Sequence, residues 1–220
     1  GMNKREEERL RRQQEKREKE LERLDKMRAY EKEYAACGSI CGIDEVGRGP
    51  LAGPVVAGAV ILKPDTEILY LNDSKKLSEK KREALYDEIM EKAAATGIGI
   101  VSPARIDEIN ILQATYEAMR MAVEDLGVRP DLLLNDAVTI PGITIPQVPI
   151  IKGDEKSVSI AAASIIAKVT RDRLMVEYDA VIPGYDLASN KGYGTKKHIE
   201  GLRELGASPI HRATFIRKFV

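Results

Sequence analysis

The sequence has no tryptophan, only two phenylalanines and two cysteines, and no long apolar run. Cys37 and Cys41 are too few for a disulfide framework or a closed zinc site, so we expect reduced thiols at both positions. The longest apolar stretch, residues 54–62, is about half the length of a membrane-spanning helix, and no hydrophobic signal segment follows Met2. These absences predict a soluble cytoplasmic protein that does not associate with membranes.

The chain also lacks net charge, because 35 lysines and arginines balance 35 aspartates and glutamates. The protein as a whole therefore exerts no long-range attraction on nucleic acid, membranes or acidic substrates, and any binding of phosphate must depend on local groups. With 43% apolar residues among 220, the chain can bury the core of one large domain. We expect this protein to be a monomer.

The first part of the chain differs in composition from the rest. Residues 3–32 contain neither glycine nor proline and are rich in glutamate, arginine and lysine, which predicts a continuous helix. Only its second half carries an apolar stripe, so this half is expected to pack on the protein while the first half projects. The stripe consists of Leu21, Leu24, Met27, Tyr30 and Tyr34. We divide the chain into a charged helical extension, 1–36, and a domain, 37–220. The extension either binds a partner that is unknown or is a solvated helix without a partner.

Within the domain, short apolar segments rich in β-branched residues alternate with segments of helical period. Strands are expected at 39–43, 55–62, 97–101, 132–134 and 148–151. Helices are expected at 78–95, 106–126 and 157–178, the first of them capped by Ser78. The first two strands are joined by a short segment rich in glycine and proline, which predicts an antiparallel pair. This order is typical of an α/β fold with a mixed central sheet flanked by helices.

Four acidic residues follow apolar strand segments: Asp44 and Glu45, Asp136, and Asp154. If the strands are neighbours, these carboxylates converge, and a hard divalent cation such as Mg²⁺ or Mn²⁺ would compensate their mutual repulsion. Successive side chains of a regular strand point to opposite faces, so Asp44 and Glu45 share a site only if the strand ends or bulges there. Gly47 makes such an irregularity feasible. The alternative is a set of separate capping or surface carboxylates.

A glycine-rich loop follows the first two acids. Gly47 and Gly49 flank Arg48, so the main-chain N–H groups here can approach a ligand closely, and the arginine can reach a phosphate. Taken alone, the loop is more typical of a hairpin turn. Its position directly beside Asp44 and Glu45 favours a binding role.

Residues 42–56, Gly-Ile-Asp-Glu-Val-Gly-Arg-Gly-Pro-Leu-Ala-Gly-Pro-Val-Val, resemble the opening block of the ribonuclease HII family. Further similar blocks follow in the order typical of that family. They are 73–77, 152–154, 159–164 with 167–168 and 171–172, 191–195 and 208–212. The resemblance covers about residues 37–217. Arg48 favours type HII, because the related type HIII enzymes carry lysine there, whereas Asn135 and Ala137 depart from the usual residues around the third acid.

The resemblance implies a ribonuclease H-like fold and an endonuclease that cleaves RNA in RNA/DNA hybrids or at a single ribonucleotide embedded in duplex DNA. It implies that Asp44, Glu45, Asp136 and Asp154 bind the catalytic Mn²⁺ or Mg²⁺. It further implies that Gly47, Arg48 and Gly49 contact the ribose 2′-hydroxyl and that Tyr193 stacks on the sugar at the RNA-to-DNA junction.

Several polar side chains are candidate phosphate contacts or structural groups. Those that we assign to phosphate are Lys75, Lys76, Ser164 and Lys168, with solvated charges as the alternative for the lysines. Tyr193 lies between two glycines, which favours an exposed side chain available for stacking, although a lone tyrosine is often partly buried core. We expect structural rather than catalytic roles for His198 and His211.

Two other functions compete with this interpretation. A junction resolvase or another nuclease of the same fold would use the same acids on DNA, and cleavage of an all-DNA substrate would indicate it. A metal-stabilised or coiled-coil binding protein would bind a hybrid without turnover in Mn²⁺.

Overall fold

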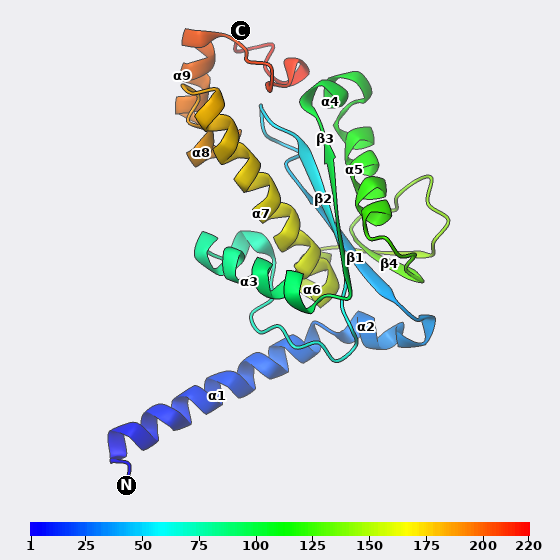
Figure 1. Ribbon diagram of the computed structural model, residues 1–220, viewed down its shortest axis with the longest axis vertical. Coiled ribbons are helices and arrows are strands. Elements are labelled where there is room, and N and C mark those ends of the chain that lie inside the picture. The colour runs from blue at the N-terminus through cyan, green and yellow to red at the C-terminus, as the bar shows by residue number, and fades with distance from the viewer.

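The computed structural model describes residues 1–220, and its centre is a five-stranded sheet (Figure 1). The strands are β1 (Ile40–Val46), β2 (Val55–Ile61), β3 (Ala95–Val101), β4 (Leu132–Asp136) and β5 (Gln147–Ile150), arranged in the order β3-β2-β1-β4-β5. β1 and β2 are antiparallel, as are β2 and β3, whereas β4 runs parallel to both β1 and β5. The predicted mixed sheet and antiparallel first pair are confirmed, and β1 lies at the centre.

Helices cover both faces of this sheet (Figure 1). One face packs against α4 (Pro103–Ile109) and α5 (Ile111–Asp125), and the other against α3 (Glu79–Lys92) and α7 (Val158–Val181). Short helices complete the chain: α6 (Gly153–Lys156), α8 (Leu187–Asn190), α9 (Lys196–Leu205) and 3₁₀ turns at Ala35–Cys37, Ser74–Lys76 and Ala213–Phe215. None of the helices is both long and apolar enough to cross a membrane.

Helix α7 packs directly on the central strands because small residues face each other there. Ala161, Ala162 and Ala163 are fully buried, and a methyl group at Gly58 of β2 would lie 2.4 Å from the Ala163 carbonyl oxygen. Gly58 pairs with Asp44 on β1. The close packing therefore fixes α7 beside the part of β1 that carries the first acid.

The N-terminal extension forms two helices, α1 (Lys4–Lys26) and α2 (Ala29–Glu33), so the prediction of one continuous helix is wrong. The helix breaks after Lys26 because of a tertiary contact: the Met27 carbonyl accepts the N–H of Val158 (3.0 Å) and so satisfies the first turn of α7. Leu24 and Met27 are buried, whereas residues 1–19 are exposed. The prediction that only the second half packs on the protein is confirmed.

The predicted helix over 106–126 also divides, between α4 and α5. Asn110 adopts φ 74° between them, and its side chain accepts the N–H of Gln113 at the start of α5. Ser78 caps α3 through Lys81, as predicted. Helices α8 and α9 were not among the predicted elements, and α9 positions residues behind the loop that carries Tyr193.

Candidate active site

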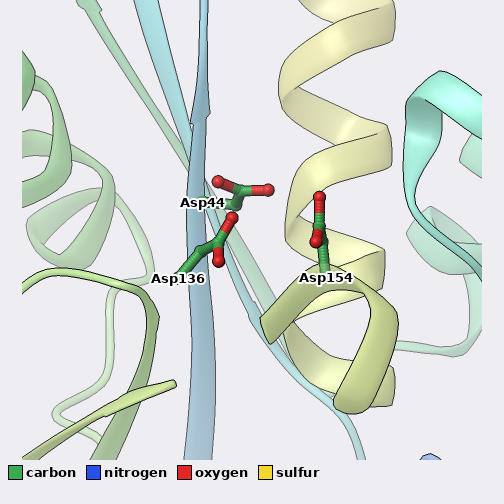
Figure 2. Close-up of side chains that lie close together, drawn as sticks. All are labelled: Asp44, Asp136 and Asp154. Carbon is green, nitrogen blue, oxygen red and sulfur yellow. The ribbon is translucent and has the colours of Figure 1, made fainter. Parts of the chain in front are cut away.

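Three aspartates from three elements meet beside the N-terminal end of α7. Asp44 lies on β1, Asp136 ends β4 and Asp154 lies in α6. One carboxylate oxygen of each lies within 4.8 Å of the others, and Figure 2 shows the three groups pointing toward a common centre. The parallel pairing of β1 with β4 brings the first two together, since Ile43 pairs with Asn135 one residue earlier.

Burial makes negative charge costly in this cluster. Asp44 and Asp154 are 4% and 7% exposed. Burial is the main cause that raises the pKa of Asp44 well above its usual range, and the charges of Glu45, Asp136 and Asp154 add to this effect. Burial, followed by Asp136 and Asp73, raises the pKa of Asp154 to about 7. The cluster therefore favours either bound protons or a cation.

The cluster has the donors that a hard divalent ion requires. Mg²⁺ binds carboxylate oxygens at about 2.0–2.1 Å, so ligands on opposite sides of the ion are roughly 4.2 Å apart. Oxygens within 4.8 Å of one another need only small side-chain movements to reach that geometry. The three aspartates therefore fit such an ion in number, chemistry and spacing.

Glu45 lies beside this cluster but is not one of the three converging carboxylates. β1 continues through Glu45 to Val46 with regular pairing to β2, so neither the strand end nor the bulge that sharing a site would require is present. The Glu45 N–H donates to Asp44 Oδ1 (2.8 Å). Burial raises the pKa of Glu45, Arg48 opposes this effect, and Asp136 adds to it. Glu45 is thus an electrostatic neighbour of the cluster on the adjoining face.

The loop that follows β1 is held by two buried arginines that sequence reasoning did not assign a role. Arg212 donates to the carbonyl oxygens of Gly47 (2.5 Å), Arg48 (2.9 Å) and Gly53 (2.9 Å). Arg171 donates to three more, which are those of Ala52, Pro54 and Lys191. Burial lowers the pKa of Arg171 to about 10 and that of Arg212 to about 9, so both remain charged at neutral pH.

These bonds determine which groups the loop presents. All peptide bonds are trans, so each N–H points opposite to the preceding carbonyl. Because the Gly47 and Arg48 carbonyls point toward Arg212, the N–H groups of Arg48 and Gly49 point away from it, and neither has a hydrogen-bond partner in the protein. Gly47 is required here, since it adopts φ 91° and a methyl group would lie 2.3 Å from Arg171 Nε.

Tyr193 lies next to this loop. Its side chain is 42% exposed, and its Cε1 is 3.6 Å from the position that a Cβ of Gly49 would take. The segment before it is fixed to the loop by the Leu51 N–H, which donates to the Gly192 carbonyl (2.8 Å). The structure therefore brings together the glycine loop and the exposed aromatic ring that the sequence singled out.

The candidate phosphate contacts differ in their surroundings. Burial alone would lower the pKa of Lys75, but Asp73 and the three clustered aspartates raise it, so this lysine faces the acids. Lys76 pairs with Glu155 (2.9 Å), and Lys168 pairs with Asp172 (2.9 Å). The remaining candidate, Ser164, is buried and hydrogen-bonded to Ser74 (2.7 Å). Among the three lysines, Lys75 alone has no ion-pair partner, and it lies close to the cluster.

Sequence reasoning gave no role to Asp73, Arg171 or Arg212. Asp73 is 7% exposed, and its proximity helps to raise the pKa of Asp154, so it extends the acidic cluster. Arg171 follows Ala163 and Ala167 at four-residue spacing, and a charged residue on that apolar helical face was a usable signal.

The departures beside Asp136 have a structural consequence. Ala137 adopts φ 64°, a left-handed conformation that favours glycine. Asn135 is fully buried, and its amide donates to Gln147 Oε1 (2.7 Å). This bond and that between the Ala137 N–H and the Ile150 carbonyl hold the end of β4 in place, so Asp136 keeps its orientation despite the unusual neighbours.

Comparisons with known proteins identify the family. The family model described as Ribonuclease HII matches residues 41–218. A ribonuclease HII of Lachnoclostridium phytofermentans is 73% identical over 198 residues, which are 90% of this chain and 78% of the relative. One of Clostridioides difficile is 56% identical over 204 residues, which are 92% of this chain and 80% of the relative.

Solved structures share the fold. The ribonuclease H2 of Pyrococcus horikoshii is 27% identical, with a TM-score of 0.68 over 82% of this chain and 96% of its own. The RNase HII of Archaeoglobus fulgidus, solved in complex with PCNA, is 29% identical, with a TM-score of 0.67 over 79% and 93%. The chain therefore belongs to the ribonuclease HII family, whose members are metal-dependent endonucleases that hydrolyse RNA in RNA/DNA hybrids and at ribonucleotides within DNA.

Proposed function

We propose that Asp44, Asp136 and Asp154 hold the divalent ion of this endonuclease, Mn²⁺ or Mg²⁺, and that Glu45 joins them as a ligand only after its side chain turns toward the ion, since β1 has no bulge there. The observation that carries this proposal is the convergence of three carboxylates from three elements within 4.8 Å. A bound ion would supply Lewis-acid activation of water and stabilisation of charge on the leaving oxygen. The carboxylates fix the place at which the scissile phosphate must lie.

Recognition of the ribonucleotide falls to the glycine loop in this proposal. The N–H groups of Arg48 and Gly49 are exposed donors without partners, and the 2′-hydroxyl oxygen can accept from them. The Gly47 and Arg48 carbonyls are already used by Arg212, so at these two peptides the loop offers donors rather than acceptors. A deoxyribose lacks the oxygen that would satisfy these amides, which gives a physical basis for selecting RNA.

Tyr193 would stack on the sugar at the RNA-to-DNA junction, because its exposed ring lies beside Gly49. Lys75 would contact a phosphate next to the acids, with Lys76, Ser164 and Lys168 farther along the backbone. For Lys76 and Lys168 this role requires exchange of their present carboxylate partners for phosphate.

The division into an extension (1–36) and a catalytic domain (37–220) belongs to the same proposal. It is supported by the exposure of residues 1–19 and by the start of the central strand at Ile40. A monomeric state and a cytoplasmic location stay predictions of the sequence.

A pair of matched duplexes tests this function. One carries a single ribonucleotide in DNA, and its twin is all deoxyribose. We expect cleavage of the first duplex alone, only when Mn²⁺ or Mg²⁺ is added, and weaker binding as salt concentration rises because local contacts carry the affinity. Cleavage of the all-deoxy twin would instead indicate a DNA nuclease such as a junction resolvase.

A further inference from the structure

The only two histidines of the chain meet in a buried contact behind the Tyr193 loop. His198 of α9 is fully buried and His211 is 5% exposed. Their Nε2 atoms are 2.8 Å apart. The ring of Tyr185 packs beside both, with centroids 4.7 Å from His211 and 6.1 Å from His198. Neither histidine belongs to the carboxylate cluster, so the cleavage chemistry does not account for them.

The hydrogen bonds of this pair fix the position of every ring proton. The main-chain N–H of Ser208 donates to His211 Nδ1 (3.0 Å), and an amide nitrogen cannot accept, so this Nδ1 carries no proton. Neutral His211 then carries its proton on Nε2 and donates to His198 Nε2. His198 in turn must carry its proton on Nδ1, which donates to the Tyr193 carbonyl (2.9 Å).

The pair has no room for an additional proton. A second proton on either ring would place two hydrogens in the short contact between the Nε2 atoms, or two in the contact between Ser208 and His211. Burial lowers the pKa of His198, and burial followed by His198 lowers that of His211 to about 4. The two rings therefore act as a fixed chain of donors and acceptors rather than as an acid or a base.

This chain ends on the residue whose ring lies beside the glycine loop. The Tyr193 carbonyl accepts from His198 and from the Thr195 N–H (2.9 Å), while the Tyr193 N–H donates to the Asn190 carbonyl (3.0 Å). With both main-chain groups engaged, the backbone of Tyr193 has one orientation, and its ring is kept next to Gly49.

We propose that the His211–His198 pair is a positioning device that holds Tyr193 against the glycine loop and so sets the preference for an RNA-to-DNA junction. This inference rests on the proposed stacking role of Tyr193. His198 and His211 are positioning residues, since their partners are each other, Ser208 and the Tyr193 main chain rather than the substrate.

Two substitutions of His198 separate its donor from its bulk. The amide nitrogen of asparagine can occupy the place of Nδ1, so His198→Asn keeps a donor to the Tyr193 carbonyl. The longer glutamine places its amide near Nε2, so His198→Gln loses that donor. The readout is the ratio of kcat/KM on duplex DNA with one ribonucleotide to kcat/KM on a continuous RNA/DNA hybrid. Thermal unfolding of each variant establishes that it is folded at the assay temperature.

Tyr193→Ala should lower this ratio, because it removes the ring that stacks at the junction. We expect His198→Gln to lower the ratio about tenfold in the same direction, on the order of one lost stacking contact. His198→Asn should stay within about twofold of the wild type, because it keeps the donor. If His198→Gln does not fold, His211→Asn replaces it. Without the His211 donor, the His198 ring is free to carry its proton on Nε2 instead of Nδ1, so it no longer donates reliably to the Tyr193 carbonyl and the ratio should fall in the same direction.

The outcomes distinguish the two proposals. A lowered ratio in Tyr193→Ala with an unchanged ratio in folded His198→Gln or His211→Asn would overturn the positioning role and leave the stacking role intact. Equal losses in His198→Gln and His198→Asn would also overturn it, since bulk rather than the donor would matter. An unchanged ratio in Tyr193→Ala would contradict the stacking role itself, and the positioning role with it.

Discussion

Replacement of Asp44 by asparagine is expected to lower kcat/KM on a duplex with one ribonucleotide by at least about 1000-fold, on the scale of losing a principal electrostatic group of an active site. Asp44 lies on the central strand and faces Asp136 and Asp154. Asparagine has nearly the same shape but lacks the negative charge that an ion requires. The measurement is single-turnover cleavage with Mn²⁺ in excess.

The same substitution should leave the protein folded and, without metal, as stable as the wild type or more so. The raised pKa of Asp44 means that its ionised form is disfavoured in the folded state, so above the usual aspartate range the charge costs stability. Urea unfolding at pH 8 checks this expectation. Asp65→Asn is the matched control, because Asp65 is exposed and should change neither activity nor stability. Normal turnover by folded Asp44→Asn protein would remove Asp44 from the site.

Replacement of Arg212 by lysine is expected to have the largest effect outside the carboxylate cluster. Lysine keeps the charge, but one ammonium group cannot reach all three carbonyls that the guanidinium now joins. Leaving buried carbonyls unpaired should lower the free energy of unfolding by roughly 2–5 kcal/mol. Misdirection of the Arg48 and Gly49 amides should lower kcat/KM on the single-ribonucleotide duplex by about 100-fold.

Urea unfolding and cleavage assays on the same preparations measure both effects. Arg203→Lys provides the control, since Arg203 is exposed and should tolerate the change without effect on either quantity. Arg212→Lys protein with wild-type stability and cleavage would show that the carbonyl contacts do not orient the loop.

The strands and the long buried helix were predictable because their signals are local. β-Branched runs identify β1 and β2, and the alanine stripe of α7 indicates close packing on the sheet. The breaks in the helices were not predictable, because they depend on distant contacts. The turn after Met27 satisfies the first amide of α7, and no pattern within residues 3–32 encodes that partner.

The site residues also divide into those with a local signal in the sequence and those that depend on distant contacts. Asp44, Asp136 and Asp154 follow apolar runs, so their convergence could be expected from strand neighbours alone. The different position of Glu45 follows from the alternation of side chains along a strand. This rule could not be applied from the sequence alone, because the residue at which β1 ends was not known. The role of Arg212 left no comparable trace, because its partners are main-chain carbonyls more than 150 positions earlier in the chain.

Calorimetric titration of metal-free protein with Mn²⁺ at pH 8 measures whether the three aspartates bind a divalent ion. The wild type should bind Mn²⁺ and, at 100 times its Kd, gain about 2.7 kcal/mol of stability, or roughly 5–11 °C in Tm. Asp44→Asn and Asp154→Asn should each weaken binding at least about tenfold, while Asp65→Asn should not. Equal Mn²⁺ affinity in all four proteins would show that these aspartates do not hold the ion.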